Sequence, residues 1–214
     1  FIEEWRKFCS KNNLDLEKIL SSIRQRKTHN NIMRSGIGVG GYCLTKDPLF
    51  AKASSEQVLH EKFEFPLSSK AVEVNQKMTF DVMSELKNRF NKKIFGKKIL
   101  LIGVSYREDT NDTRYSPAEG VFNFFKKMNC KISFYDPIVN YWDFTDSHSI
   151  EKKNLNNFDV YVYLIKHQSF KKLNISYKKK SLILDLNHVL ENNERSKISN
   201  NKNFESYFIG SQQQ

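Results

Sequence analysis

Hydrophobic positions in the first part of the chain recur at helical spacing. Apolar residues predicted to share a face are Ile2, Trp5, Phe8 and Cys9, followed after a break by Leu16, Ile19, Leu20 and Ile23. Spacings of three and four residues are typical of amphipathic helices that bury one stripe. The break falls at Asn12–Asn13. We therefore expect two short helices, with Cys9 as a buried core thiol rather than a reactive one.

A longer helix is predicted over residues 68–90. Its apolar positions are Ala71, Val74, Met78, Val82, Leu86 and Phe90, with neither Gly nor Pro between them. A pattern that persists for about twenty residues indicates one continuous amphipathic helix. We expect this helix to link parts of the molecule or to form a dimer contact.

The period changes at about residue 97, where continuous apolar runs replace the helical stripe. The predicted strands lie within residues 97–104, 130–137, 159–165, 180–186 and 203–210. Runs of this kind are typical of buried parallel strands. Ser116, Pro117 and Glu119 predict an N-cap, a first helical residue and a capping box for a helix that ends near Met128. Strands alternating with helices predict an α/β fold with a Rossmann-like parallel sheet.

Two domains follow from this change of period. Residues 1–94 are predicted to be a helical central and dimerisation domain, and residues 95–214 a Rossmann-like domain. A chain of 214 residues is long enough to bury a substantial core. It shows no apolar run of membrane-spanning length and no signal-peptide pattern. The cysteines Cys9, Cys43 and Cys130 lie far apart, so we expect no disulfide, no metal site and a cytoplasmic location.

The formal net charge is +11, which raises the question of an anionic partner. The basic residues are scattered, mostly as Lys-Lys pairs, rather than gathered in one segment. Nucleic-acid binding is therefore not expected, and a polyanionic small molecule accounts for the charge at least as well. The five histidines share no metal-ligand spacing and are expected at the surface or in packing contacts.

The stretch GIGVGGYCLTKDP, residues 36–48, contains Gly36, Gly38 and Gly41 at G-x-G-x-x-G spacing. A dinucleotide-binding loop with this spacing follows a strand and opens a helix. Here the preceding residues are polar, and Pro48 obstructs a helix that starts at the glycines. We therefore interpret the glycines as bringing bare backbone close to a ligand.

Cys43 follows these glycines, and Asp47 lies four residues further on. A single helical turn over this segment would place the thiol and the carboxylate on one face, with Lys46 beside them. A neighbouring ammonium or helix N-terminus raises the reactive thiolate fraction. The alternative is a half-buried loop cysteine without a chemical role.

Two long motifs resemble the UDP-glucose/GDP-mannose dehydrogenase family. GIGVGGYCLTKDPLF is similar to the active-site loop of that family, and KKILLIGVSYREDTNDTRYSPA is similar to the first strand and loop of its UDP-binding domain. The segments VNQKM and CKISFYDP fall in the family order. The resemblance covers essentially the whole chain and implies a helical central domain followed by a Rossmann-like, UDP-binding domain.

The resemblance also implies a chemistry. Members of the family use NAD to oxidise the C6 alcohol of a nucleotide sugar to the uronate in two steps. By analogy Cys43 would form a thiohemiacetal and then a thioester, and Asp47 would help to activate water. Lys46 and Arg114 match positions that reach the cofactor. The expected partners are the nucleotide sugar and a second copy of the chain, bound through the central helices.

Substrate contacts are implied for the glycine-rich segment and for the loop after the first strand. The matching positions are Arg34, Gly36, Gly38, Val39, Gly40, Leu44, Tyr106 and Arg107. From the residues alone, Arg107 and Arg114 could instead form a local charge cluster with the neighbouring acids. Asp136 imitates a ribose-binding acid, but we interpret it as part of an Asp-Pro turn.

Two departures from the family pattern limit these expectations. The family's N-terminal NAD domain is absent from this sequence, so we expect the chain alone to be inactive. Asn187 stands where many relatives carry a substrate-binding arginine. A non-catalytic nucleotide-sugar-binding or dimerising remnant is therefore the alternative to a dehydrogenase. The residues identify neither the hexose nor the nucleotide, which is UDP or GDP.

Overall fold

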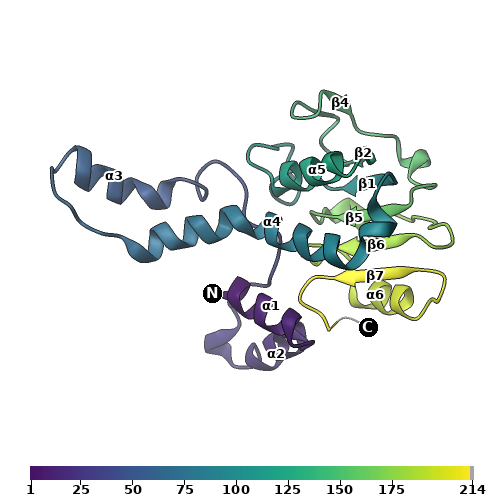
Figure 1. Cartoon of the computed structure of the whole chain (residues 1–214), viewed down its shortest axis with the longest axis horizontal. Helices are drawn as coiled ribbons and strands as arrows, with labels where there is room; N and C mark the ends of the chain where they lie inside the picture. Colours follow the sequence, from purple (N-terminus) through teal and green to yellow (C-terminus); the bar gives the residue numbers. More distant parts are fainter. Residues whose placement is uncertain (213–214) are drawn as a thin grey trace.

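Five parallel strands form the centre of the carboxyl-terminal half in the computed structural model, which describes residues 1–212 (Figure 1). They are β1 (Lys98–Ile102), β2 (Lys131–Tyr135), β5 (Val160–Tyr163), β6 (Leu182–Asp185) and β7 (Glu205–Phe208). Their order in the sheet is β2-β1-β5-β6-β7, and every neighbouring pair is parallel. Each strand lies within one of the predicted apolar runs, so the predicted Rossmann-like sheet is confirmed.

The sheet buries both of its faces, which explains why its strands are continuously apolar. Ile99 and Leu101 of β1 point into a core shared with α4 (Pro66–Ile94) and α5 (Pro117–Lys127). Leu100 and Ile102 point to the opposite face, where α6 (Asn192–Ser199) contributes Ile198 to a second core. The alternation along one strand therefore fixes a three-layer arrangement.

The amino-terminal helices α1 (Ile2–Lys11) and α2 (Leu16–Ile23) break where predicted, and Asn13 there has a φ of 51°. Cys9 is buried as expected, but the predicted face of α1 is wrong for Trp5 and Phe8, which are 45% and 54% exposed. The buried face carries Glu3 and Arg6 instead.

Charge pairing explains this reversal in α1. The Arg6 guanidinium donates to both carboxylate oxygens of Glu3, and it donates to Glu85 of α4 at 2.8 Å. Glu85 also accepts a hydrogen bond from the Tyr207 hydroxyl of β7. Because every charge is paired, the polar face can be buried at the junction of α1, α4 and β7.

The division of the chain into two domains between residues 94 and 95 stays a prediction.

Helix α4 is the predicted long helix, and its backbone is kinked at Phe90. Its amino-terminal part extends away from the sheet beside α3 (Phe50–Gln57), and the two helices form an arm (Figure 1). Its carboxyl-terminal part packs against α5 and the sheet. One helix therefore connects the arm to the sheet. No helix in residues 1–212 has the length and apolarity needed to cross a membrane.

Smaller elements show where the sequence pattern was incomplete. Ser116 caps α5 as predicted, but its side chain accepts from the Ala118 amide and makes no capping box with Glu119. A reciprocal capping box joins Glu191 and Glu194 at α6. The hairpin of β3 (Tyr141–Trp142) and β4 (Ser147–His148) was not predicted, because strands of two residues carry no period. Short 3-10 segments lie at Lys27–His29, Asp47–Leu49, Lys152–Asn154 and Gln168–Lys172.

Candidate functional site

The strand order reverses between β1 and β5, where loops 103–116 and 164–168 leave the carboxyl edge of the sheet. Open parallel sheets bind ligands at such a switch point. The two loops touch at Gly103, which has a φ of 79° and whose added Cβ would lie 2.4 Å from the Ile165 carbonyl oxygen. Only glycine allows this approach, so the contact between the two loops depends on that residue.

The glycine-rich segment lies against the same edge. A Cβ added to Gly40 would lie 2.6 Å from the Tyr115 carbonyl oxygen, and one added to Gly41 would lie 2.7 Å from the Tyr106 ring. A Cβ added to Gly36 would lie 2.6 Å from Oδ1 of Asn187. The glycines therefore let this segment pack against loop 103–116 and the end of β6. Close approach to a ligand stays a prediction.

Helix α4 holds the middle of the glycine-rich segment. The Asn75 side chain accepts from the Val39 amide at 2.7 Å and donates to the Val39 carbonyl at 2.8 Å. One turn along, the Thr79 hydroxyl donates to the Ile37 carbonyl at 2.6 Å. Neither side chain was among the predicted site residues. Both are polar residues beside the predicted apolar stripe, and Asn75 lies in the segment VNQKM, which falls in the family order.

Cys43 begins a single helical turn, the arrangement considered for this segment. Its carbonyl accepts from the amides of Lys46 and Asp47, at 3.2 and 2.8 Å, and its side chain is exposed. The Lys46 ammonium lies 2.6 Å from the Asp47 carboxylate, and that hydrogen bond raises the pKa of Lys46. The ammonium also lies 4.2 Å from the centre of the Tyr42 ring. The thiol therefore stands beside an ordered cation and carboxylate.

This cysteine turn contacts loop 103–116. The Gly41 amide donates to the Arg114 carbonyl at 3.2 Å, and the rings of Tyr42 and Tyr115 lie 6.0 Å apart. The Arg114 guanidinium lies 5.9 Å from the Tyr42 ring centre. Two segments far apart in sequence are thereby joined around Cys43.

Arg114 also forms a local ion pair, as the alternative interpretation expected. Its guanidinium lies 2.6 Å from the Asp112 carboxylate, and this hydrogen bond lowers the pKa of Asp112. The pair is exposed on the arginine side, so the guanidinium keeps a face toward solvent.

The other predicted site residues do not all lie beside the cysteine turn. Arg34 lies 3.5 Å from Glu17 of α2, on the side of the segment that faces α6. Leu44 is 66% exposed, and Arg107 is also exposed. The structure thus brings Cys43 and its neighbours to Tyr106 and Arg114, but it turns Arg34 toward α2.

A cleft of about 390 Å³ lies between the cysteine turn, α4 and the start of α5. Gly38, Val39 and Lys46 line one side, and Asn75 and Tyr115 line others. A cleft of this size falls within the range of small-molecule sites. Polar backbone, an amide side chain and an ammonium converge there.

The end of β2 shows that the sheet is not used as a dinucleotide site in the usual way. Asp136 is buried, and its Oδ1 accepts from the Ile138 and Val139 amides at 3.0 Å, which confirms the predicted turn. Its Oδ2 accepts from the Val104 amide and from the His167 ring. Burial alone would raise the pKa of Asp136, but these hydrogen bonds outweigh it and lower the pKa. The carboxylate has no capacity left for a ribose.

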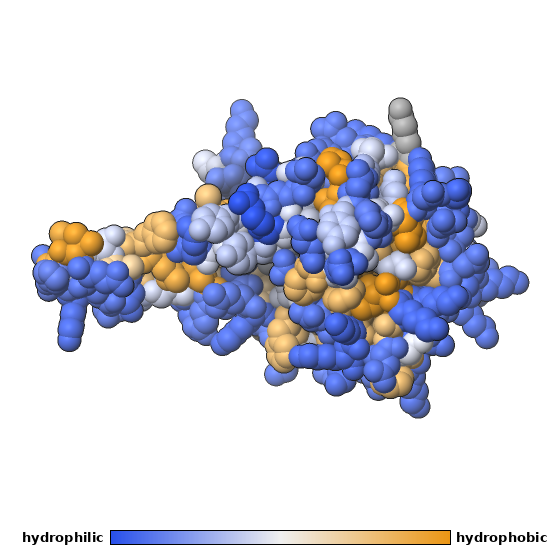
Figure 2. All heavy atoms as spheres, turned by 90° about the horizontal axis from the view of Figure 1, so that it is seen from above, coloured by the Kyte–Doolittle hydropathy of each residue, from blue (hydrophilic) through white to orange (hydrophobic). Residues whose placement is uncertain are grey.

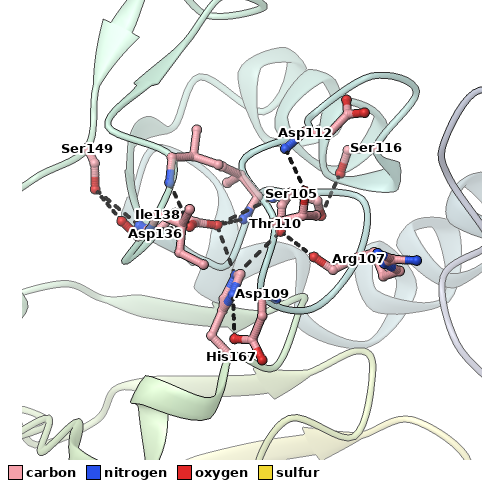
Figure 3. Close-up of polar contacts among 12 residues, drawn as sticks. Ser105, Arg107, Asp109, Thr110, Asp112, Ser116, Asp136, Ile138, Ser149 and His167 are labelled. Atoms are coloured by element: carbon pink, nitrogen blue, oxygen red, sulfur yellow. Dashed lines mark hydrogen bonds and ion pairs between the residues drawn. The ribbon is translucent and has the colours of Figure 1, made fainter.

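His167, one of the histidines expected at the surface or in packing contacts, packs against the Phe170 ring and also belongs to a polar cluster. Its ring is fully buried and hydrogen-bonded among Ser105, Asp109 and Asp136 (Figure 3). This cluster could not be predicted from the sequence, because its members come from three different strand ends. Within residues 1–212, no three His, Cys, Asp or Glu side chains are placed to hold a metal ion.

Comparisons with known proteins agree with this geometry. Residues 1–77 match the central domain of the UDP-glucose/GDP-mannose dehydrogenase family, and residues 100–192 match its UDP-binding domain. A UDP-N-acetyl-D-mannosamine dehydrogenase from Methanococcus vannielii is 32% identical over 201 residues, which cover 89% of this chain and 44% of that protein. A UDP-glucose 6-dehydrogenase from Rickettsia prowazekii is 24% identical over 227 residues, covering 99% and 50%.

Solved structures share the fold. The crystal structure of an NDP-N-acetyl-D-galactosaminuronic acid dehydrogenase from Methanosarcina mazei has a TM-score of 0.78 and 21% identity, covering 99% of this chain and 47% of that one. The chain spans about half the length of the curated relatives it matches.

Proposed function

The chain belongs to the UDP-glucose/GDP-mannose dehydrogenase family, and from that premise we propose that it supplies the nucleotide-sugar site and the reactive cysteine of an NAD-dependent nucleotide-sugar dehydrogenase. The observation that carries this proposal is the packing of the exposed Cys43 turn against loop 103–116, at the switch point of the sheet. Neither segment has a structural need for an exposed thiol beside a cation and a carboxylate.

In the proposed reaction, the Cys43 thiolate adds to the C6 aldehyde of the sugar and forms a carbon–sulfur bond. The product is a thiohemiacetal, which is oxidised to a thioester. Water then adds to the thioester carbonyl, and departure of the thiolate leaves a carboxylate and restores Cys43. Asp47 is proposed to orient or deprotonate that water.

Asp47 is held for this role by its neighbour. The Lys46 ammonium lies 2.6 Å from the Asp47 carboxylate, and at least a third of the carboxylate side chain remains open to solvent. The ion pair with Lys46 holds the carboxylate in one orientation. The same ammonium is available to an anionic group that enters the adjoining cleft.

NAD, when bound, would supply the two-electron oxidation at each stage. The described residues offer NAD only peripheral contacts. The glycine-rich segment packs against protein, and both carboxylate oxygens of Asp136 already accept hydrogen bonds. Lys46 and Arg114 are the two cations that we propose to reach the cofactor. Each is already oriented by an acidic neighbour.

The proposed substrate class is a UDP-linked hexose. The matched domain is described as UDP-binding, and similar proteins are named for UDP-N-acetyl-D-mannosamine and UDP-glucose. Tyr106 and Arg107 are proposed to contact the nucleotide, the ring by packing and the guanidinium by pairing with a phosphate. The glycine-rich segment and Leu44 are proposed to face the sugar. GDP-mannose is the competing ligand.

Calorimetric titration of the chain tests this proposal. The ligands are UDP, UDP-glucose, UDP-N-acetylmannosamine and GDP-mannose. Arg107→Ala should weaken binding of the preferred ligand about tenfold or more, because a hydrogen bond to a charged group contributes about 1.5–3 kcal/mol. Lys131→Ala removes one positive charge from the opposite edge of the sheet and should leave the affinity unchanged.

Two outcomes would reject the proposed site. Equal loss in both variants would mean that the affinity reflects net charge alone. Absence of binding by all four ligands would favour a dimerising remnant without a ligand.

A further inference from the structure

Four residues at the switch point form a polar cluster, which we call the His167 cluster: the buried Ser105, Asp136 and His167, and the exposed Asp109. The His167 ring is fully buried and lies where the chain leaves β5 (Figure 3). Because the ring is shielded from solvent, the contact of interest is the one that it makes with loop 103–116.

The hydrogen bonds of the ring fix its tautomer. The Asp109 amide donates to Nδ1 at 3.1 Å, so Nδ1 carries no proton. The ring proton then lies on Nε2, which is 3.2 Å from Oδ2 of Asp136 and 3.4 Å from the Ser105 hydroxyl oxygen. The ring therefore accepts a hydrogen bond on one side and donates on the other.

One side of the ring is anchored to the sheet. Asp136 also accepts from the Val104 amide at 2.8 Å and from the two amides of its own turn. A carboxylate with this many donors is fixed in position, and the ring that donates to it is fixed as well.

The other side of the ring holds loop 103–116. Asp109 has a φ of 54°. Its amide donates to the His167 ring, and its carboxylate accepts from the Gln168 amide at 3.0 Å. Two hydrogen bonds therefore join Asp109 to His167 and Gln168. The Ser105 hydroxyl donates to the Arg107 carbonyl at 2.8 Å. Contacts at 105 and 109 therefore bracket the two residues proposed to contact the nucleotide.

The two side chains between these anchors lie outside the cluster. The Arg107 side chain is exposed and is directed away from the cluster (Figure 3). The Tyr106 ring lies over Gly41 of the glycine-rich segment. Fixing the backbone on both sides lowers the entropy that Arg107 and Tyr106 would lose on binding a ligand.

We propose that His167 is a positioning residue, which holds the backbone of loop 103–116 through Nδ1 so that Tyr106 and Arg107 are presented to the nucleotide sugar. The inference rests on the proposed function, because it assigns a ligand to this loop. It goes beyond that function in identifying the buried contact on which the presentation depends.

Two substitutions separate the two sides of the ring. In His167→Asn, the side-chain oxygen can take the place of Nδ1 and accept from the Asp109 amide, but the donor to Asp136 is lost. In His167→Gln, the side-chain NH₂ can take the place of Nε2 and donate to Asp136, but the acceptor for the loop is lost. His148→Gln, in the exposed hairpin, is the control for loss of a histidine.

The measurements are the affinity for the preferred UDP-sugar and the hydrogen exchange of the Asp109 amide. We expect about tenfold weaker binding in His167→Gln, which corresponds to about 1.4 kcal/mol, and recovery to within about threefold of wild type in His167→Asn. Faster exchange of the Asp109 amide should accompany the weaker binding. A purely structural role would lower the thermal midpoint of both variants and would not separate their affinities.

Equal affinities in the two variants, or unchanged exchange at Asp109 in both, would overturn the inference. If the wild-type chain binds none of the sugar nucleotides, the proposed function fails. The exchange measurement still decides the positioning claim in that case: faster exchange in His167→Gln than in His167→Asn supports it, and equal exchange refutes it.

Discussion

Burial separates the three cysteines at the scale of single residues. Cys9 is 2% exposed in the core of α1 and α2, and the Cys130 thiol donates to the Ile94 carbonyl at 3.1 Å. Burial raises the pKa of both of these thiols. Cys43 is exposed on its turn. Cys43 is therefore the most exposed of the three thiols, and it lies at the site proposed for the chemistry.

Alkylation with iodoacetamide should modify Cys43 first, followed slowly by Cys130 and then Cys9, because the thiolate is the reacting species and needs access. Peptide mass spectrometry after timed quenching measures the order. The preferred UDP-sugar should slow modification of Cys43 and leave the other two rates unchanged. Faster labelling of Cys130 than of Cys43 would contradict the structure.

His188 provides a pH-dependent contribution to stability. Its Nε2 donates to the Ser35 carbonyl at 2.9 Å, and burial and the nearby Arg195 lower its pKa to about 4. The folded state therefore disfavours the protonated ring. Since the unfolded chain binds a proton near pH 6.5, stability is fully present above that pH and is lost as the pH falls toward 4.

Lowering the pH from 7 to 5 should therefore cost the wild type about 1–2 kcal/mol more than His188→Gln, which does not titrate. Urea unfolding at both pH values measures the difference. The charged groups that face the ring are Arg34, Arg195, Asp185 and Glu17. Burial raises the pKa of Glu17, so its protonation offsets part of the loss. An equal loss in both proteins would show that His188 does not contribute.

Elements with a continuous apolar run could be predicted from the sequence, and elements set by contacts could not. All five strands of the sheet and helix α5 followed from period and capping residues. The buried face of α1 was wrong because the Arg6–Glu3–Glu85 pairing is visible only once α4 lies beside it. The hydrophobic periodicity of one helix does not reveal ion pairs that it makes with another element.

The candidate site divides in the same way. The Cys43 turn and its neighbours followed from spacing and family motifs, but Asn75 and His167 did not. Each acts on a backbone group of a segment far along the chain, 36 residues away for Asn75 and 58 for His167. Contacts of this kind appear only when the elements have been assembled.

The junction of β1 and β5 can be tested with two glycines that share a conformation. Gly103 and Gly96 both have positive φ, but an added Cβ at Gly103 meets the Ile165 backbone, whereas nothing lies within 4 Å at Gly96. Gly96→Ala should cost about 1 kcal/mol for its backbone conformation alone. Gly103→Ala should cost several kcal/mol more in chemical denaturation, because two strand ends must separate. Equal costs would mean that the approach is flexible.

The whole molecule is elongated, with apolar side chains exposed along the arm of α3 and α4 (Figure 2). The exposed apolar residues of the arm and its connection are Phe50, Val58, Leu59, Phe63, Leu67 and Phe80. Patches of this kind are typical of interaction surfaces. A second copy of the chain remains the partner we propose, with the two arms packed together.

Sedimentation velocity tests this proposal. The wild type should be a dimer at micromolar concentration, and Leu67→Lys combined with Phe80→Lys should shift it to monomer, because each side chain is more than two-thirds exposed here and would be desolvated in the dimer. Phe95→Lys, an exposed apolar position at the other end of α4, should leave the dimer intact. A wild-type monomer would reject the proposal, and so would a dimer in all variants.

The glycine-rich segment has a consequence for the order in which the chain assembles during synthesis. Ser35, just before the segment, accepts a hydrogen bond from His188, which lies 153 residues further along the chain. Gly40 and Gly41 pack against Tyr115 and Tyr106. Contacts so distant in sequence form late, because a long stretch of chain must close first. A ribosome must therefore complete β6 before the Cys43 turn can reach its final place. Until then the Cys43 turn lacks its contacts with loop 103–116, and the site proposed for the chemistry is not assembled.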